Sequence, residues 1–396
     1  VSAADLLALY MALEMSSLAL YVLASFSRDH AKSSEAGLKY FVLGALASGM
    51  MLFGMSLVYG FAGSTSFSAI SELFAGQHYV LSKGVVVGLI LIVVGFCFKL
   101  SAVPFHMWTP DVYQGAPTPV TAFFASAPKV AALAVFTRVA LTAFPDILSQ
   151  WQQIVVFVAI ASMVLGSFAA IGQTNIKRLM AYSSIGHMGF ALVGLAAGTV
   201  EGAQGVLVYI SIYVAMTLGT FAVILTMKRN GQHVESIRDF AGLSRTNPLL
   251  AFFFAMLLFS LAGVPPLAGF FSKDEILWFA FASTRGGHVL LWAVASLTAL
   301  MTAFYMFRLL WLTFLGTSRM SPEVEHHVHE SPWSMTGVLL LLASLSAVGG
   351  FFGVPHFLEP MLPLPRVDPH LHHFEMPLVV GSVVLALIGL AGAAFL

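Results

Sequence analysis

The sequence predicts an all-α protein that crosses a lipid bilayer about eleven times, with two of the crossing helices broken by proline. Of the 396 residues, 59% are hydrophobic and only 9% are charged, whereas a soluble domain carries about 25% charged residues. The apolar residues fall into stretches of roughly 20, the length that spans a bilayer core of about 30 Å. Prolines interrupt two of these stretches, and this predicts the two broken helices.

The composition excludes several functions. Eighteen Lys and Arg balance eighteen Asp and Glu, so there is no basic field to hold the phosphates of a nucleic acid. The single cysteine, Cys97, excludes a disulfide framework and an iron–sulfur cluster, which needs about four thiolates. The chain contains no GxGxxG, Walker or HExxH motif. We therefore expect no redox cofactor, no cofactor-binding residues and no metal site.

The predicted spans begin almost at the first residue. The sequence starts at Val1 and has no charged leader before the first apolar stretch. We therefore expect a fragment or a processed form of a longer membrane protein. The spans are 3–27, 34–61, 80–103, 115–144, 151–172, 176–198, 202–228, 248–282, 287–315, 334–354 and 374–396. Pro265 and Pro266 must interrupt the long stretch 248–282. The segment 80–119 is interrupted by Pro104, Pro110, Pro117 and Pro119.

Lys and Arg in the loops predict the orientation, because cytoplasmic loops carry an excess of both. The loops that follow odd-numbered spans hold Arg28, Lys32, Lys177, Arg178, Lys228, Arg229, Arg238, Arg245 and Arg319. Those that follow even-numbered spans hold Arg285 and Arg366, with Lys83 close by. We therefore expect the first set in the cytoplasm, or on the equivalent matrix side, and the first helix to start outside.

Each of the two broken helices carries a lysine near its break. Lys99 lies five residues before Pro104, and Lys273 lies seven after Pro266. The predicted orientation makes the two helices run in opposite senses. Paired, opposed, proline-broken helices are typical of an inverted-repeat transporter. The predicted units are 1–146 and 147–315, with 316–396 as appended helices.

Charged residues inside the spans need an explanation, because each costs about 2.5–3.5 kcal/mol at the bilayer centre. Such residues either reach an interface or form structural ion pairs, or else they carry ions. Arg138, Asp274 and Glu275 can reach an interface, but the side chain of Glu14 is too short to do so. A buried lysine near a carboxylate can exchange protons near neutrality. The candidates for such exchange are Glu14, Lys39, Lys99, Lys129 and Lys273.

Histidines are further proton carriers. His187 lies in the sixth span with hydroxyl groups four and five residues before it. It is either a polar step between two lysines or a hydrogen-bonded structural histidine. Two other groups lie in loops, where we expect solvated histidines rather than zinc ligands; they are His326, His327, His329, His370, His372 and His373.

Five motifs make the sequence resemble a known family. They are residues 13–18 (LEMSSL), 35–41 (EAGLKYF), 99–106 (KLSAVPFH), 108–113 (WTPDVY) and 177–184 (KRLMAYSS). All resemble the antiporter-like subunits of respiratory complex I, the NADH:quinone oxidoreductase, and through about residue 268 they resemble subunit N (chain 2). Residues 268–277 (AGFFSKDEIL) and 329–336 (HESPWSMT) look like subunit L (chain 5) instead. The resemblance therefore suggests a mosaic or fusion of the two subunits.

The resemblance implies an inverted-repeat, antiporter-like fold and a role in moving protons without a redox cofactor. By it, Glu14 and Lys39 match a Glu/Lys pair, Lys99 the broken-helix lysine, Lys129 the connecting lysine and Lys273 the terminal one. At 1.5 Å per residue, however, Glu14 lies about 20 Å from the turn near residues 28–33 and Lys39 only about 9 Å from it. A direct contact between these two would need a long lysine stem, a distorted turn or a bridging water.

The resemblance also implies partners and a location. We expect neighbouring membrane-arm subunits of complex I, the lipid bilayer and protons as partners, and no nucleic acid. The expected location is a bacterial inner membrane, in preference to the mitochondrial one. Two alternatives stay open at this point: a subunit of a multisubunit Na⁺/H⁺ antiporter, and a membrane scaffold in which buried ion pairs only hold helices together.

Overall fold

A computed structural model describes residues 1–76, 81–229, 232–283, 289–314, 333–352, 357–358 and 371–395. In this part of the chain, nine helices are long and apolar enough to cross a membrane. Shorter apolar helices accompany them. The all-helical membrane fold is therefore confirmed, with fewer full-length spans than the eleven predicted.

The first part of the chain forms eight helical segments. α1 and α2 are a helical hairpin, and α3 is a short helix that precedes the first broken helix. The bounds are α1 Leu6–Ala24, α2 Ala31–Ala62, α3 Phe67–Ala75, α4 Lys83–Leu100, α5 Trp108–Gly115, α6 Thr118–Phe124, α7 Ala127–Thr142 and the 3₁₀ helix η1 Pro145–Ile147.

The second part begins with three long helices. These are α8 Leu148–Ile171, α9 Ile176–Ala196 and α10 Val200–Thr226. A two-residue antiparallel pair, β1 Lys228–Arg229 and β2 Gln232–His233, follows them. The remaining elements are η2 Ile237–Phe240, α11 Leu243–Thr246, α12 Pro248–Ala262, α13 Ala268–Ala282, α14 Val289–Phe314, α16 Trp333–Val348, η3 Gly349–Phe351 and α18 His372–Ala394.

One predicted interruption is found in the structure, and one predicted span is shorter than expected. The stretch 248–282 is two helices, α12 and α13, as Pro265 and Pro266 predict. The span predicted at 334–354 is the short helix α16, which gives way to the 3₁₀ helix η3 at a pair of glycines, Gly349 and Gly350. Glycine weakens a helix, so the α-helix ends at this pair although the apolar stretch continues past it.

Polar side chains start the principal helices. Asp5, Ser82, Asn175, Thr199 and Asn247 each accept a hydrogen bond from a backbone N–H in the first turn of the following helix. These are the residue types that satisfy the free N–H groups at a helix start. Hence short polar sequences between apolar stretches fix where α1, α4, α9, α10 and α12 begin.

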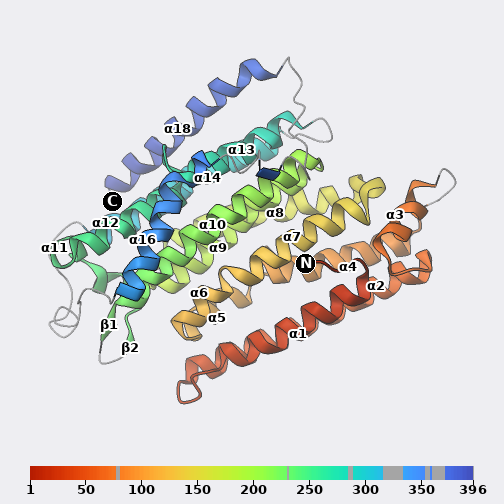
Figure 1. Ribbon diagram of the computed structural model, residues 1–396, viewed down its shortest axis with the longest axis horizontal. Helices are drawn as coiled ribbons and strands as arrows, with labels where there is room; N and C mark the ends of the chain where they lie inside the picture. Colours follow the sequence, from red (N-terminus) through yellow and green to blue (C-terminus); the bar gives the residue numbers. More distant parts are fainter. Residues whose placement is uncertain are drawn as a thin grey trace.

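The helices lie nearly parallel, with α1 at one edge, α18 at the other and α8, α9 and α10 between them (Figure 1). Almost every residue of α9 is buried, whereas α1 and α18 are largely exposed. α9 packs closely on α8, because a side chain at Gly166 would meet the backbone N of Gly186 at 2.6 Å. Small residues allow such close helix packing in membranes.

The turns rich in Lys and Arg gather at one end of the bundle. The turn between α1 and α2, the turn before α9 and the β1–β2 hairpin all lie at the lower left of Figure 1. A backbone hydrogen bond from Ile176 to Glu235 joins two of them. α4 runs toward this end and α12 runs away from it, so the two broken helices are antiparallel to each other.

Candidate functional site: a row of buried lysines

Glu14 and Lys99 meet polar side chains where α1, α2 and α4 come together. The hydroxyl of Ser48, on α2, donates to Glu14 Oε1. Lys99 Nζ, at the end of α4, donates to the hydroxyl of Ser17, which lies one turn after Glu14 on α1. Glu14 and Ser17, the partner of Lys99, therefore share one face of α1.

The structure does not bring Glu14 and Lys39 together, so the implied pair is not present. Lys39 Nζ instead lies 2.8 Å from Asp111 Oδ2 and 2.5 Å from Glu35 Oε1. The reason is the register of the α1–α2 hairpin, which sets Glu14 level with Ser48, deeper in α2 than Lys39. This separation agrees with the different depths of Glu14 and Lys39 expected at 1.5 Å per residue.

Asp111 is the centre of a charged cluster at the end of the bundle that holds the basic turns. Its second oxygen, Oδ1, accepts from Arg178 Nη1 at 2.6 Å. α5, which carries Asp111, is not one of the nine candidate spans. Burial raises the pKa of this carboxyl group, but hydrogen bonds from Lys39 and Arg178 outweigh it and hold the pKa below its ordinary value of 3.8.

Lys129 is buried in the middle of the bundle, with 1% of its surface exposed. Its Nζ donates to the hydroxyl of Ser184 at 2.6 Å, and this hydroxyl lies 2.6 Å from that of Tyr213. The ring of Tyr113 lies 5.5 Å from the ammonium nitrogen and adds a cation–π contact. Lys129 thus has hydroxyl and aromatic partners in place of an anion.

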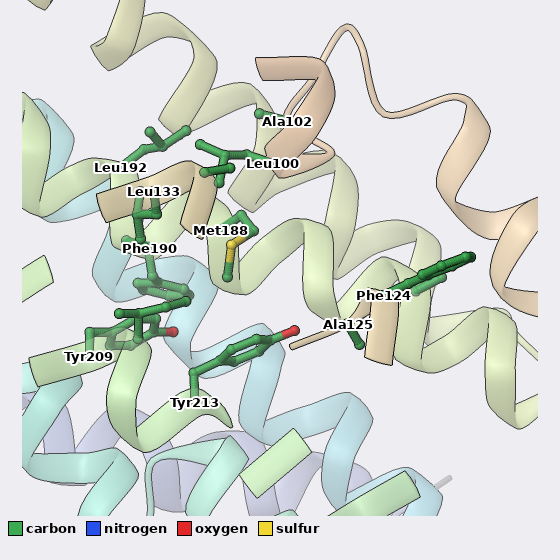
Figure 2. Close-up of a cluster of buried hydrophobic side chains, with 14 of the residues drawn as sticks. Leu100, Ala102, Phe124, Ala125, Leu133, Met188, Phe190, Leu192, Tyr209 and Tyr213 are labelled. Carbon is green, nitrogen blue, oxygen red and sulfur yellow. The ribbon is translucent and has the colours of Figure 1, made fainter. Parts of the chain in front are cut away.

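His187 lies one turn after Ser184 on α9 and is equally buried. Its Nδ1 is 2.6 Å from the hydroxyl of Tyr209, while Nε2 has no hydrogen-bond partner within the described part of the chain. Tyr209 and Tyr213 stand one turn apart on α10, beside Met188 and Phe190 of α9 (Figure 2). Hydroxyl groups can donate or accept, so these tyrosines can form hydrogen bonds whether or not their neighbours are protonated.

Lys273 has a different kind of partner. Its Nζ donates to the backbone carbonyls of Leu261 at 2.7 Å and Ala262 at 3.2 Å, at the end of α12. The side chain is 5% exposed, and the ring of Phe190 lies 5.3 Å from the ammonium nitrogen. The break therefore folds α13 back so that its lysine reaches the carbonyls that α12 leaves free.

The other charged candidates make different contacts, and Asp274 lines a small cavity beside Lys273. Arg138 donates to the backbone carbonyl of Val1 at 2.9 Å. Asp274 accepts from Ser382 and lines a cavity of about 190 Å³ together with Glu275 and Glu375.

The histidine groups are mostly not part of the described structure. His326, His327, His329 and His370 lie outside it, and so does the side chain of His372. Among the described residues, no group of three or more His, Cys, Asp or Glu could hold a metal ion.

The hydroxyl partners of the lysines and of His187 were not predicted from the sequence, and the hydroxyl groups four and five residues before His187 are not among them. A weak signal was available for two tyrosines. Tyr209 and Tyr213 are spaced by four in an apolar span and so share one face of a helix. Ser17, Ser48 and Ser184 have no such signal, because their meaning depends on which helix packs against them.

Comparison with known proteins identifies the family. The sequence pattern of the NADH:quinone oxidoreductase/Mrp antiporter transmembrane family matches residues 3–302. NADH-quinone oxidoreductase subunit N of Beijerinckia indica subsp. indica is 62% identical over 310 residues, 78% of this chain and 64% of the relative. The subunit N of Parvibaculum lavamentivorans is 54% identical over 360 residues, 91% of this chain and 71% of that relative.

The chain thus spans slightly less than two thirds of the Beijerinckia relative. Solved structures agree in fold. A chain of respiratory complex I from Thermus thermophilus with bound aureothin has a TM-score of 0.74 and 34% identity, covering 89% of this chain and 75% of that one. A chain of the archaeal membrane-bound sulfane sulfur reductase has a TM-score of 0.75 and 25% identity, covering 99% and 74%. The protein therefore belongs to the NADH:quinone oxidoreductase/Mrp antiporter transmembrane family.

Proposed function

We propose that this chain is a proton-translocating subunit of the membrane arm of an NADH:quinone oxidoreductase. The relatives named above are subunits N of that enzyme. In this proposal the chain moves H⁺ and carries out no redox chemistry by itself. Electron transfer takes place elsewhere in the complex, and the chain contributes a path through the membrane.

The observation that carries the proposal is what three lysines inside the bundle bind: Lys99, which is half-buried, and Lys129 and Lys273, which are buried. Among the described residues, Lys99, Lys129 and Lys273 form no salt bridge with a carboxylate. A scaffold that uses buried ions to hold helices together needs them paired, because an uncompensated buried charge costs several kcal/mol. Lysines whose partners are hydroxyls and carbonyls suit a transported proton better than a fixed ion pair.

The proposed proton carriers are Glu14, Lys39, Lys99, Lys129, His187 and Lys273. Hydrogen bonds extend from members of this set, Lys129 and His187 among them, to hydroxyl groups outside it. Ser184 and Tyr213 extend from Lys129, and Tyr209 extends from His187 one turn away. Hydroxyl groups and bound water can relay a proton between such stations, since each can accept one hydrogen bond and donate another.

We propose the same unit boundaries that the sequence predicts: 1–146 and 147–315 as opposed halves, and 316–396 as appended helices. The antiparallel course of α4 and α12 supports the opposed halves, and the first boundary falls within η1. The end of the bundle that holds the basic turns is proposed to face the cytoplasm. The proposed partners are neighbouring antiporter-like subunits of complex I, in a bacterial inner membrane.

We also propose that the chain is a mosaic of N-like and L-like sequence with a switch near residue 268. The supporting observation is the pair of L-like motifs at 268–277 and 329–336. The Parvibaculum subunit N aligns over 360 residues, so that similarity necessarily continues past the switch. A separate comparison of residues 269–396 with subunits N and L tests the mosaic, and higher identity to subunit N overturns it.

Replacement of Lys129 tests the proposed function. Lys129→Met keeps the volume of the stem, so the complex should assemble while the rate of proton translocation through this subunit falls roughly tenfold or more. Lys129→Arg should fail as well, because a guanidinium does not deprotonate near neutral pH. The measurement is acid uptake into inverted vesicles at matched content of the complex. Normal translocation by Lys129→Arg would remove the lysine from the path.

The matched family includes Mrp antiporters as well. Replacing Na⁺ by another ion therefore distinguishes a proton-translocating subunit from a Na⁺/H⁺ antiporter subunit. Substituting K⁺ for Na⁺ in the vesicle assay should leave proton translocation unchanged. A rate that follows the Na⁺ concentration would favour a Na⁺/H⁺ antiporter. Loss of assembly in Lys129→Met, with normal translocation by the small fraction that assembles, would favour the scaffold.

A further inference from the structure

The short helix α5 directly follows the break after Lys99, and its first residue touches the end of α4. The indole Nε1 of Trp108 donates to the backbone carbonyl of Phe98 at 3.0 Å. Phe98 immediately precedes Lys99. The position of α5 therefore bears directly on the last turn of α4, where the lysine side chain begins.

Asp111 joins α5 to two other helices. One carboxylate oxygen binds Lys39 of α2 at 2.8 Å, and the other binds Arg178 of α9 at 2.6 Å. Charge-assisted bonds of this kind are stronger than neutral ones. Each oxygen has its own cation, so loss of the carboxylate charge weakens both connections at once.

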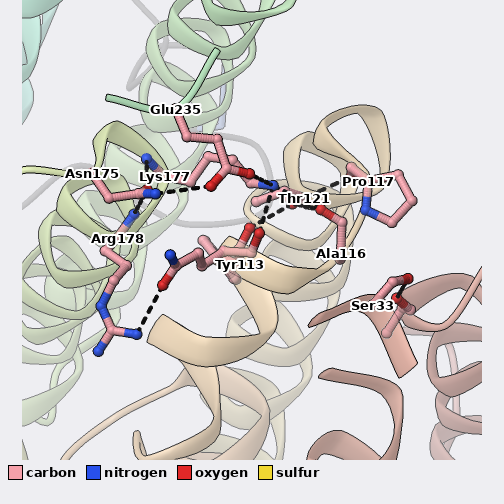
Figure 3. A network of polar contacts seen from close by, with 11 residues as sticks. Ser33, Tyr113, Ala116, Pro117, Thr121, Asn175, Lys177, Arg178 and Glu235 are labelled. Atoms are coloured by element: carbon pink, nitrogen blue, oxygen red, sulfur yellow. Dashed lines mark hydrogen bonds and ion pairs between the residues drawn. The ribbon is translucent and has the colours of Figure 1, made fainter. Parts of the chain in front are cut away.

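A second set of contacts ties the C-terminal end of α5 to α9. Lys177 Nζ donates to the carbonyls of Gln114 and Ala116 at 2.8 Å each, and Glu235 neutralises it at 3.1 Å. Figure 3 shows Lys177 and Arg178 side by side at the start of α9, facing α5. A cation at the C-terminal end of a helix also interacts favourably with the negative end of the helix dipole.

The same α9 holds the partners of the next lysine. Ser184, which binds Lys129, lies less than two turns beyond Arg178. α5 is consequently bonded at one end to the last turn of α4 and along its polar side to the helix that serves Lys129. It therefore connects the two lysine sites through hydrogen bonds and an ion pair.

We propose that Asp111 is a positioning residue that holds α5 between α2 and α9 and so keeps the break at Lys99 in register with the Lys129 site. The importance of this register for proton movement rests on the function proposed above. Asp111 acts through α5 and touches neither Lys99 nor Lys129. A cavity of about 140 Å³ beside it, lined also by Lys32, Glu35 and Gln114, keeps the carboxylate in contact with water.

Asp111→Asn in the intact complex tests this proposal, and Cys97 supplies a direct readout. Cys97 is the chain's single cysteine, it is 1% exposed, and its carbonyl accepts the backbone bonds that close α4. Loosening of α5 should raise alkylation of Cys97 by N-ethylmaleimide severalfold, measured by mass spectrometry of this chain. Asp111→Glu, which keeps the charge, should restore protection.

Glu35→Gln is the matched control. Glu35 shares Lys39 with Asp111 but makes no bond to α5 that the structure records, so its loss should leave Cys97 protected. If Asp111→Asn does not assemble, Arg178→Gln breaks the same connection and is read in the same way. Where both single variants assemble, the double variant should resemble the stronger single variant, because both changes remove one interaction.

The two proposals fail separately. Wild-type protection of Cys97 in an assembled Asp111→Asn or Arg178→Gln complex would overturn the positioning role. Equal exposure in Glu35→Gln would overturn it as well. Normal pumping by Lys129→Met and Lys129→Arg, alongside Cys97 exposure in Asp111→Asn, would overturn the proposed function and leave the positioning of α5 supported.

Discussion

The two broken helices end in the same way but treat their lysines differently. α4 closes at Ser101 and α12 at Gly263, both with positive φ, at 62° and 83°. In each case the next residue, Ala102 or Val264, bonds back to the carbonyl five residues earlier. This is the Schellman pattern of a helix C-terminus. The local structure of the two breaks is therefore nearly identical.

What differs is the group that satisfies the freed carbonyls. At the first break the indole of Trp108 takes the carbonyl of Phe98, and Lys99 is left to bind the hydroxyl of Ser17. At the second break Lys273 itself takes the carbonyls of Leu261 and Ala262. The comparison teaches that a lysine beside a break can be either independent of the backbone or part of its support.

The largest expected effect concerns the independent lysine. Lys99→Arg keeps a cation near Ser17 but cannot release its proton near neutral pH. The rate of proton translocation through this subunit should therefore fall roughly tenfold or more, a change of at least about 1.4 kcal/mol in the barrier. Translocation is measured in vesicles against Lys99→Met at equal assembly. A pumping Lys99→Arg complex would show that the first lysine is only a fixed charge.

The next largest effect is a difference in stability between the variants Lys273→Met and Lys99→Met. Lys273→Met should leave two carbonyls at the end of α12 without their donor, at a cost of about 1–3 kcal/mol for a buried group. Lys99→Met leaves no carbonyl unpaired, so the complex should melt close to the wild-type temperature. Thermal unfolding of both purified variants checks this. Equal melting temperatures would contradict the supporting role of Lys273.

A smaller effect is expected at the turn of the second break. Gly263→Ala places a side chain at a positive φ, which costs about 1 kcal/mol or more. Its Cβ would also lie 3.0 Å from Cδ of Lys273 and press on that side chain. We expect a lower melting temperature and weaker translocation together. Gly60→Ala is the control, since nothing lies within 4 Å of its added Cβ.

The smallest effect is the converse change at the first break. Ser101→Gly removes the strain of a positive φ but adds flexibility to the unfolded chain, and the two terms are each about 1 kcal/mol. Stability should stay within about 0.5 kcal/mol of wild type. Chemical denaturation of the isolated complex measures it. A loss larger than that would mean that the serine hydroxyl supports the break.

Much of the fold could be predicted from the sequence, because helix length and proline position are local properties. The apolar stretches gave most of the long helices, and Pro265 and Pro266 located the second break. The candidate lysines could be found because a charge is conspicuous in an apolar stretch. Their partners could not, since Ser17 and Ser184 become significant only through packing between helices distant in sequence. The Lys39–Asp111 pair depends in the same way on the register of the α1–α2 hairpin.

The nearly complete burial of α9 has a consequence for how the protein is made. α9 carries Lys177, Ser183, Ser184 and His187, and a helix with these groups is a poor occupant of lipid by itself. Its close packing on α8 suits insertion of the two as one hairpin during synthesis. Lys129 is translated before Ser184, and Tyr213 follows later still. Lys129 therefore enters the membrane before its partners are made, and its site is complete only after α10 has been synthesised.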